Sequence, residues 1–387
     1  MDKYKLSVNC AFGIENILKR ELQLLGKTDL KAQNGSIVFD GDSDDVANCN
    51  MFLRTAERVF IEVARFNAET FDGLFDGVYG VDWQNYLTPD ACIVVNAKSV
   101  KSDLFALSAI QSISKKAIIK KLTDVTKNSV FSETGARYNI EVNLSENQAT
   151  VLIDTSGAGL HKRGYRDYVA AAPLKETLAC AILLLSDFGF DRPFYDPFCG
   201  SGTLVTEGAR IALNVASGRD RDFAYTHWQN FDKTAYSKAK QRALDSQKTD
   251  RKIDFCGGDV NPKAIELCER HAHRAGISDK VKFFVADVAD FKPATSHGTI
   301  VTNPPYGQRL LDVKSARILL RTLGDNYKNA EDWSAFILTA DDQAERAFGR
   351  RADKKRKLFN AQTQCNLYQF FKRSNAGKHF TPLRDFL

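Results

Sequence analysis

The sequence predicts an α/β fold in which a doubly wound, Rossmann-like parallel sheet forms the C-terminal part and smaller α+β units precede it. From about residue 158 onward, short apolar runs alternate with long helical stretches, which is typical of a parallel sheet with helices on both faces. Before residue 158, strands and helices are shorter and follow one another in mixed order. The 387 residues are enough for two or three domains, each with its own core.

The first unit is expected to cover residues 1–66. Its apolar pattern predicts a strand, an amphipathic helix that ends at Gly26, a second strand, and a helix that continues into a third strand. This order of elements suits a small ferredoxin-like α+β unit.

The second unit is expected to cover residues 67–157. The stretch "ACIVVNAKSV" reads as a strand and "YNIEVNLSENQATVLIDTSG" as a hairpin. Between them lies a helix with one apolar side, formed by Leu104, Leu107, Ile110, Ile113 and Ala117. Four lysines point away from that side, which predicts a basic surface above a sheet: Lys115, Lys116, Lys120 and Lys121.

The third unit is expected to cover residues 158–387. Its strand candidates are "FYDPFCG", "KIDFCGGDV", "VKFFVADV", "GTIVTNPP" and "WSAFILTA". A basic loop leads into this unit, followed by a helix that starts near Pro173, a favourable residue for a first helical turn.

Composition narrows the class of protein only moderately. A net charge of +6 favours a polyanionic partner weakly, and the basic run "GRRADKKRKLFN" suits either a nucleic acid or a solvated face. Eight scattered cysteines without a CxxC pair predict reduced thiols in a cytoplasmic protein, and neither they nor the six histidines have metal-ligand spacing. No apolar run is long enough for a membrane span, and the N-terminus lacks the apolar core of a signal peptide.

The first motif that carries chemistry is "DPFCGSGT", which runs from Asp196 to Thr203 at the end of a predicted strand. Gly200 and Gly202 permit a tight turn and a close approach of a ligand, and the next helix offers free N–H groups. Asp196 would repel the pyrophosphate that such a turn holds in nicotinamide-binding folds. It suits a cationic amino-acid moiety instead.

Two further acidic residues end the next two predicted strands. Asp259, in "GGDVN", can accept both hydroxyls of a ribose, although its distance from the glycine turn far exceeds the roughly 20 residues of a dinucleotide fold. The insertion "RDRDFAYTHWQNFDKTAYSKAKQRALDSQKTD" accounts for that distance. Asp287, beside the apolar Val288, can meet an adenine amine. Each aspartate, taken alone, could equally be a helix cap.

The fourth motif is "NPPYG", which follows the fourth predicted strand at Asn303. Its two prolines exclude a helix and a central strand, so it forms a rigid loop. The four motifs fall in order at the carboxyl ends of consecutive strands, where an open α/β sheet binds its ligands. That order favours one composite site over four unrelated caps.

Together, "DPFCGSGT", "GGDVN", "VADVADF" and "TNPPYG" resemble the class I methyltransferases that use S-adenosyl-L-methionine and modify exocyclic amines of nucleic-acid bases. The upstream stretch "GLHKRGYRDYVAAAPLKETLACAIL" resembles the entry segment of the RlmL-like rRNA guanine-N(2)-methyltransferases. Members of that group carry a ferredoxin-like unit and a THUMP domain, an RNA-binding module, before the catalytic domain. The resemblance therefore implies a THUMP domain at residues 67–157 and a methyltransferase domain at residues 158–387.

The resemblance also implies roles for individual residues. Asp196, Gly200 and Gly202 would hold the methionine end of the cofactor, Asp259 the ribose, and Asp287 the adenine amine. The other residues of these motifs that the resemblance assigns to the cofactor are Pro173, Lys175, Glu176, Phe198, Thr203, Val260, Val288 and Asn303.

The resemblance implies a catalytic role for Asn303, Pro304, Pro305 and Tyr306. The Asn303 side-chain oxygen and the Pro304 carbonyl could each accept an N–H of the substrate amine, and Tyr306 would stack on the extruded base. Cys199 lies in the cofactor turn and no cysteine flanks Asn303, so Cys199 reads as packing and not as a nucleophile.

Several readings stay open at this point. The favoured one is methylation of guanine in RNA, most of all in 23S rRNA, with tRNA as an alternative substrate. An adenine-specific DNA methyltransferase would use the same loop, but the extra mass of this chain precedes the catalytic domain and resembles an RNA module. A third reading is an RNA-binding or assembly factor without catalysis, which the complete acidic set argues against. The sequence does not determine the oligomeric state.

Overall fold

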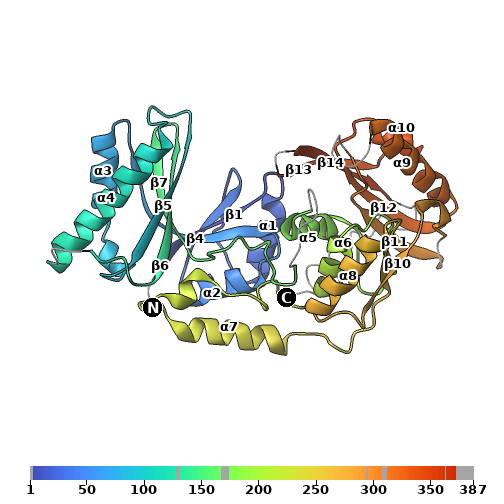
Figure 1. The fold of residues 1–387 in the computed structure, drawn as a ribbon, viewed down its shortest axis with the longest axis horizontal. Coiled ribbons are helices and arrows are strands. Elements are labelled where there is room, and N and C mark those ends of the chain that lie inside the picture. Colours follow the sequence, from blue (N-terminus) through green and yellow to red (C-terminus); the bar gives the residue numbers. More distant parts are fainter. Residues whose placement is uncertain are drawn as a thin grey trace.

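The structure is a computed structural model that describes residues 3–127, 131–166, 174–292, 295–306, 312–361 and 363–371. Two seven-stranded sheets dominate it, one in the N-terminal part and one in the C-terminal part (Figure 1). Their mixed α/β character confirms the predicted fold class. None of the helices in the described ranges has the length and apolar character that a membrane span needs.

The N-terminal sheet has the strand order β2-β3-β1-β4-β7-β6-β5. Its strands are β1 (Tyr4–Cys10), β2 (Lys31–Gln33), β3 (Ser36–Gly41), β4 (Ala56–Asn67), β5 (Cys92–Val100), β6 (Arg137–Ser145) and β7 (Gln148–Asp154). Its helices are α1 (Glu15–Leu24), α2 (Ser43–Phe52), α3 (Phe71–Tyr79) and α4 (Leu107–Thr126). A 3₁₀ turn, Trp83–Asn85, follows α3.

The long strand β4 joins the two predicted N-terminal units into this one sheet. Its first half pairs with β1 and its second half pairs with β7, both in antiparallel register. The ferredoxin-like strands and the strands of the second unit are therefore hydrogen-bonded to opposite edges of the same strand, which ties the two units together rigidly.

Helix α4 buries a face that differs slightly from the predicted one. Ile110 and Ala117 are fully buried as expected, but Leu107 is 43% exposed. The buried face instead continues through Ser114, Ile118 and Leu122. The helix begins only at Leu107, so that residue has no preceding turn to pack against the sheet.

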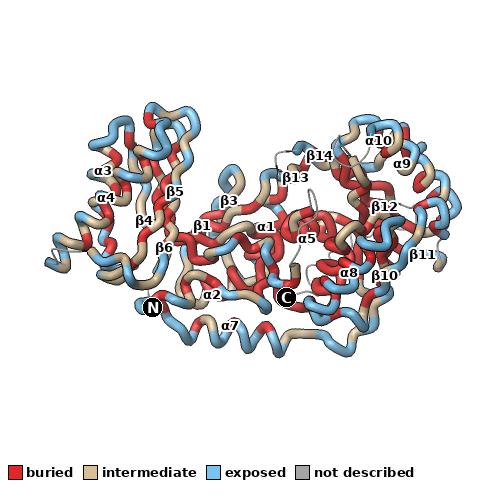
Figure 2. Tube along the Cα trace, in the orientation of Figure 1, coloured by how far each residue is buried: buried red, intermediate tan, exposed pale blue. Residues whose placement is uncertain are grey.

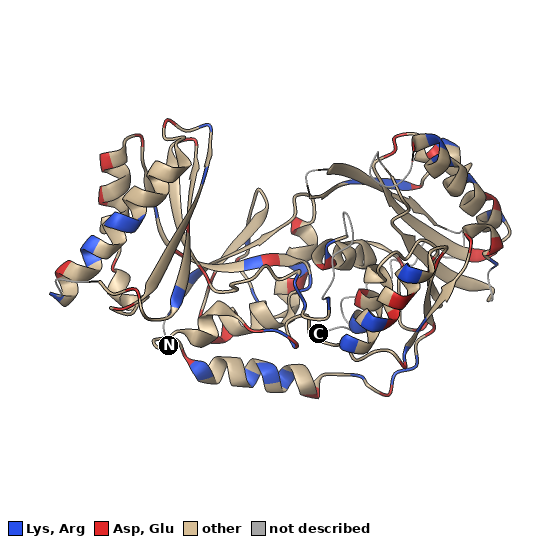
Figure 3. Ribbon diagram, viewed as in Figure 1, with Lys and Arg blue, Asp and Glu red and all other residues tan. Residues whose placement is uncertain are grey.

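Acidic neighbours partly neutralise the lysines of α4, which are among the basic residues drawn in Figure 3. The Nζ atoms of Lys115, Lys120 and Lys121 lie 2.7, 2.6 and 3.4 Å from carboxylate oxygens of Glu133, Asp124 and Asp82. The basic surface predicted for this helix is therefore weaker than the sequence alone suggested.

The C-terminal sheet has the strand order β10-β9-β8-β11-β12-β14-β13. Its strands are β8 (Phe194–Asp196), β9 (Phe255–Asp259), β10 (Val281–Val285), β11 (His297–Thr302), β12 (Asp332–Thr339), β13 (Lys354–Asn360) and β14 (Thr363–Phe370). Its helices are α5 (Glu176–Leu185), α6 (Thr203–Ala212), α7 (Lys233–Asp245), α8 (Pro262–Arg274), α9 (Val313–Lys328) and α10 (Ala344–Phe348). Short 3₁₀ turns occupy Ala224–His227 and Val288–Asp290.

The first five strands of this sheet are parallel, and each coincides with a predicted strand. The strand order reverses between β8 and β11, so the carboxyl ends of these two strands flank the switch point of the doubly wound sheet. Strands β13 and β14 form an antiparallel hairpin that the sequence did not predict. Part of the basic run forms β13, the edge strand.

The insertion between α6 and β9 reaches back to the N-terminal sheet. Helix α7 packs against α2 along the lower edge of the N-terminal part, and the chain after it runs on to the C-terminal part (Figure 1). The Trp228 ring stacks on the ring of Tyr138 in β6, with centroids 4.7 Å apart, and its Nε1 donates to the Arg137 carbonyl at 3.2 Å. The insertion thus fastens the C-terminal part to the second N-terminal unit.

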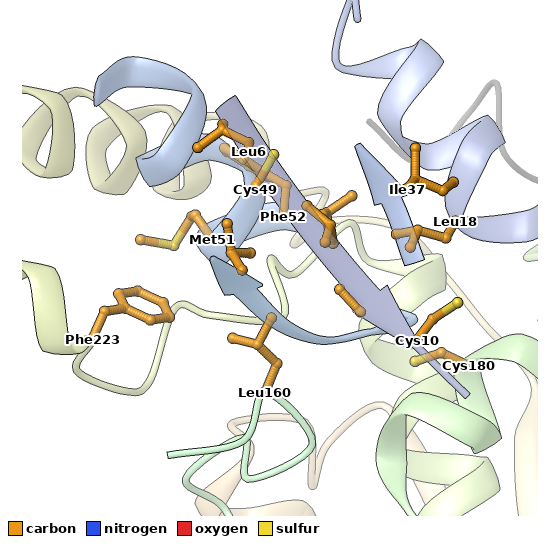
Figure 4. Packing of buried hydrophobic residues seen from close by; sticks show 14 of the residues in the cluster. Leu6, Cys10, Leu18, Ile37, Cys49, Met51, Phe52, Leu160, Cys180 and Phe223 are labelled. Atoms are coloured by element: carbon orange, nitrogen blue, oxygen red, sulfur yellow. The ribbon is translucent and has the colours of Figure 1, made fainter. Parts of the chain in front are cut away.

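The two parts also share a continuous apolar core. Helix α5 is buried from Glu176 to Leu184, as its colour in Figure 2 shows. Cys180 of α5 faces Cys10 of β1, and Phe223 of the insertion lies on the same side as Met51 of α2 (Figure 4). Because these residues are buried in one cluster, packing as well as the insertion holds the two parts together.

Candidate active site

The turn after β8 carries the first motif. Gly200 and Gly202 have φ angles of 53° and 76°, in the left-handed region that favours glycine. A Cβ atom on Gly200 would meet nothing within 4 Å, whereas one on Gly202 would lie 3.1 Å from Cys268 Sγ. The free N–H groups at the start of α6 follow directly. The turn is therefore open at Gly200 and closely packed at Gly202.

Asp196 ends β8 and is buried, with 2% of its surface exposed. Its Oδ1 accepts hydrogen bonds from Thr302 Oγ1 at 2.6 Å and from the Phe198 amide at 3.1 Å. Burial raises the pKa of the Asp196 carboxyl to about 7 although these hydrogen bonds lower it. A cationic ligand group would favour the ionised form, so the position suits an ammonium group and opposes a phosphate.

Asp259 ends β9 and bridges to the glycine turn. Its Oδ2 accepts a hydrogen bond of 3.0 Å from the Gly200 amide, and its Oδ1 accepts one of 2.9 Å from the Asn261 amide. The N-cap of α8 is Asn261, whose side chain accepts from the Lys263 amide, so Asp259 is not that cap. The Asp259 carboxylate keeps lone pairs that can accept hydroxyl groups.

Asp287 follows β10, the strand that pairs in parallel with β9. It is exposed, and its Oδ1 caps the next 3₁₀ turn by accepting from the Ala289 amide at 2.9 Å. Val260 is 69% exposed and Val288 is buried. No hydrogen bond from the described residues reaches the second oxygen of Asp287. This carboxylate and the exposed Val260, at the ends of adjacent strands, suit a flat ring that bears an amine.

The fourth motif begins where β11 ends. Thr302 donates to Asp196, so Asn303 lies across the switch point from the cofactor turn. The side-chain Oδ1 of Asn303 is buried and has no hydrogen-bond partner among the described residues. Leaving such an oxygen unpaired costs about 1–3 kcal/mol, so the observation points to a ligand that supplies an N–H. Pro304 is buried beside it.

Tyr306 is held by the β13–β14 hairpin. Its hydroxyl oxygen accepts a hydrogen bond of 3.2 Å from Asn360 Nδ2 and lies 3.4 Å from Cys365 Sγ. Burial raises the pKa of the Tyr306 hydroxyl. The ring is half-buried, and Pro305, before it, is also half-buried.

The entry segment meets the glycine turn through Arg166, a residue that the sequence reasoning missed. Its guanidinium donates to Ser201 Oγ at 3.1 Å and to Thr203 Oγ1, and lies 3.2 Å from the buried Glu176 carboxylate. Burial raises the pKa of Glu176, while Arg166 lowers it. The stretch "KRGYRDY" contains several cations, and nothing in its pattern distinguished Arg166.

The remaining predicted residues are spread around the turn. Lys175 precedes α5, which begins at Glu176, and its Nζ lies 3.4 Å from Glu57 of β4. The Phe198 amide donates to Asp196, as described above, and the Phe198 ring packs beside the core of the sheet. Pro173 lies outside the described residues. The cofactor roles expected for these residues stay predictions.

Cys199 is packed and unreactive in this site. Its Sγ lies 3.8 Å from Cys268 Sγ, in a small cluster with Ile265. The contact with Cys268, together with burial, raises the pKa of the Cys199 thiol, which disfavours the thiolate.

The site as a whole fits S-adenosyl-L-methionine. Asp196 suits its ammonium group, the room at Gly200 its amino-acid backbone, Asp259 its ribose, and the edge at Val260 its adenine. When bound, this cofactor supplies a methyl group on a positively charged sulfur. An open sheet of this order with these strand ends defines a class I, S-adenosyl-L-methionine-dependent methyltransferase.

Comparison with known protein families supports the same class of enzyme. The family model described as the RMKL-like methyltransferase domain matches residues 163–369, and the chain belongs to that family. The RlmL ferredoxin-like domain matches residues 5–60, and the THUMP domain matches residues 68–154. These matches confirm the resemblance drawn from the sequence, including the THUMP domain.

Individual relatives extend over most of the chain. YpsC of Bacillus subtilis (strain 168), provisionally named an RNA methyltransferase, is 38% identical over 373 residues, covering 96% of this chain and 97% of YpsC. The crystal structure of SMU.472, provisionally described as a methyltransferase and complexed with S-adenosylhomocysteine (SAH), is 42% identical. It has a TM-score of 0.92 and covers 96% of this chain and 99% of that one.

A third relative is longer. The ribosomal RNA large subunit methyltransferase K/L of Shewanella frigidimarina (strain NCIMB 400) is 28% identical over 382 residues, which are 96% of this chain and 53% of the relative. This chain therefore spans about half the length of that relative.

Proposed function

We propose that this protein transfers the methyl group of S-adenosyl-L-methionine to the exocyclic amine of guanine in RNA, with 23S rRNA as the substrate. The observation that carries the proposal is the Oδ1 of Asn303, next to the rigid Pro304–Pro305 pair. This oxygen is buried and has no hydrogen-bond partner within the described part of the chain. An acceptor held in this way suits a substrate amine with two N–H groups to offer.

The chemistry follows from how an aromatic amine reacts. Its lone pair is delocalised into the ring, so the free amine is a poor nucleophile. Asn303 Oδ1 and the Pro304 carbonyl oxygen each accept one N–H, which favours the tetrahedral amine of the transition state over the planar ground state. The prolines fix the direction of the carbonyl, which reduces the entropy lost in alignment.

The methyl transfer needs no strong general base. The amine nitrogen forms a bond to the methyl carbon as the carbon–sulfur bond breaks, and the sulfur keeps the electron pair of that bond. The methylated nitrogen is then positively charged and loses its proton to water. Tyr306, anchored by Asn360, would form one wall against the base.

The assignment of RNA is supported by the N-terminal half and by the relatives. A THUMP domain precedes the catalytic domain, and the names of YpsC and of the K/L enzyme specify RNA. We place the domain boundaries at residues 66/67 and 157/158. The first lies near the end of the shared strand β4. DNA adenine methylation remains the competing enzymatic reading of the same loop.

The deciding experiment is nucleoside mass spectrometry of 23S rRNA, tRNA and DNA from a strain that lacks the gene. We expect one N2-methylguanosine of 23S rRNA to disappear, to return with the wild-type gene, and to stay absent with Asn303→Ala. Loss of a methylated guanine in tRNA would move the substrate to tRNA. Loss of N6-methyladenine from DNA would overturn the proposal.

A further inference from the structure

A cavity of about 450 Å³ lies where the three units meet, and Lys175 is the one described residue with a role assigned above that lines it. Its walls come from the end of β1, from β4, β5 and β6, from the start of α5, and from the tip of the β13–β14 hairpin. The volume falls within the range of about 300–1,000 Å³ typical of small-molecule sites.

Two aromatic rings from different units meet at this cavity. Phe12, from the turn after β1, is 57% exposed, and its ring is perpendicular to that of Phe359 in β13, with centroids 5.9 Å apart. An exposed phenylalanine that forms one wall of a cavity offers a stacking surface. Flat aromatic ligands, nucleobases above all, bind in this way.

A buried acceptor lies beside the same cavity, on Asn9. The side-chain Oδ1 of Asn9 is shielded from solvent, yet no hydrogen bond reaches it from the part of the chain that the structure describes. It is the same kind of unsatisfied amide oxygen as that of Asn303. A rotation of the Asn9 amide toward the cavity would let this oxygen accept an N–H from the edge of a base.

The charged residues that line the cavity leave a small excess of positive charge, which suits a strand with phosphates along it. They are the cations Arg58, Lys98 and Lys175 and the carboxylates Glu57 and Glu141. Lys98 and Lys175 line the cavity, each with one carboxylate neighbour, Glu141 at 3.0 Å and Glu57 at 3.4 Å. Both ammonium groups keep solvent access, with 64% and 43% of their side chains exposed. They can therefore also contact a phosphate. On β13, Lys357 lies 5.6 Å from the Phe359 ring.

The hairpin connects this cavity to the catalytic loop. Phe359 and Ala361 line the cavity, and Asn360 between them donates to Tyr306. Alternate residues of a strand point to opposite faces, so one tip serves both sites. The hairpin is seated on the N-terminal unit by Arg356, whose Nη2 donates to the Gly13 carbonyl at 2.8 Å.

We infer that this cavity binds an unpaired nucleobase that neighbours the target nucleotide, with Phe12 and Phe359 as stacking surfaces and Asn9 as a hydrogen-bond acceptor. This inference rests on the proposed function, because it treats the substrate as a polynucleotide. It adds a second contact point on the substrate strand, one residue along the hairpin from the anchor of Tyr306.

The test measures the binding of short, unstructured oligoadenylate and oligouridylate, as RNA and as DNA, to the full-length protein saturated with SAH. Stacking on one aromatic ring contributes about 1–3 kcal/mol, so we expect Phe12→Ala and Phe359→Ala to raise the Kd roughly tenfold. Phe12 is largely exposed, so Phe12→Ala remains informative if Phe359→Ala fails to fold. Ile318→Ala, 63% exposed on α9, is the matched control and should leave the Kd unchanged.

Photocrosslinking gives an independent readout. Oligonucleotides that carry 4-thiouridine or its deoxy form should crosslink to peptides that contain Phe12 or Phe359, and Phe12→Ala should reduce the yield. Unchanged Kd values in both Phe variants, or crosslinks that map only elsewhere, would overturn the inference.

The outcomes separate this inference from the proposed function. If guanine in RNA is methylated but the Phe variants bind and crosslink like the wild type, only the inference fails. If DNA crosslinks at the cavity and DNA adenine is methylated, the inference stands and the proposed function fails.

Discussion

Thr302 Oγ1 donates a hydrogen bond of 2.6 Å to Asp196 Oδ1, and this bond joins the cofactor turn to the strand that ends at Asn303. The residue that orients the carboxylate expected to hold the cofactor therefore precedes the residue expected to hold the substrate amine. Both partners are buried, so a shift of β8 or β11 would displace residues on both sides of the switch point.

Cofactor binding should depend on pH through Asp196. Its pKa is raised to about 7 by burial, and a cationic ammonium ligand needs the ionised form. We expect SAH to bind more tightly as the pH rises from about 6 to about 8, with release of a proton on binding. Calorimetry in two buffers of different ionisation enthalpy measures both quantities.

The matched control is Asp196→Asn, which should bind SAH weakly, with an affinity that does not change between about pH 6 and about pH 8. The same pKa has an opposite effect on folding. Because the folded value lies above the ordinary one, the stabilising contribution of Asp196 is complete below about pH 4 and is lost as the pH rises through about 7. Equal pH profiles of binding for wild type and Asp196→Asn would refute the assignment.

The two turn glycines should fail in different ways. Gly200→Ala places a methyl group in open space, so it should cost only the left-handed strain of about 1–2 kcal/mol while blocking SAH binding. Gly202→Ala pushes against Cys268 and Phe283 at 3.1–3.2 Å and should lower the free energy of unfolding further. Urea unfolding and SAH titration of both variants check this. A Gly200→Ala variant with wild-type affinity would contradict it.

Asn303→Ala should separate chemistry from cofactor binding. Removing one aligned acceptor from the transition state should reduce kcat by about 10²–10³, as the loss of an oxyanion-hole donor does. The affinity for SAH should stay within about twofold, since Asp196, Gly200 and Asp259 are untouched. Single-turnover methyl transfer and calorimetry measure the two effects. Full turnover in Asn303→Ala would exclude the amine-holding role.

The insertion between α6 and β9 should stabilise the protein through its contact with strand β6 of the N-terminal sheet. Tyr138 and Trp228 are both buried and stacked, so a double-mutant cycle with Tyr138→Leu and Trp228→Leu should give a coupling energy of about 1 kcal/mol. Trp333 packs beside Phe291 on the far sheet, so the cycle of Tyr138→Leu with Trp333→Leu should be additive. Denaturant unfolding supplies the free energies, and additivity in both cycles would mean that the stacking adds nothing.

The sequence predicted the strand ends that form the candidate site, because local signals and chain order agree there. Asp196, Asp259, Asp287 and Asn303 each end an apolar run, and the rule that ligands bind at carboxyl ends of parallel strands brings them together. The sequence also left a choice that the structure resolves, because only coordinates show that Asn261 and not Asp259 caps α8.

What the sequence could not predict are contacts between segments far apart in the chain. The run from Lys354 to Lys357 read as charge alone, yet its neighbours Leu358 and Phe359 make it the edge strand of the sheet. Arg166 has no periodic or spacing signal, because its role depends on where Ser201 and Thr203 fold back. The seat of Arg356 on Gly13 spans most of the chain and has no local signature.

The length of strand β4 has a consequence for how an RNA substrate would be positioned. Its 12 residues extend roughly 40 Å at about 3.3 Å per residue, with β1 along one end and β7 along the other. If the THUMP domain holds an RNA element, as proposed, this strand fixes the distance from that element to the ferredoxin-like unit, on which the β13–β14 hairpin is seated through Arg356. Lengthening the RNA between that element and the target guanine should therefore abolish methylation of that guanine, because it no longer lies at the fixed distance.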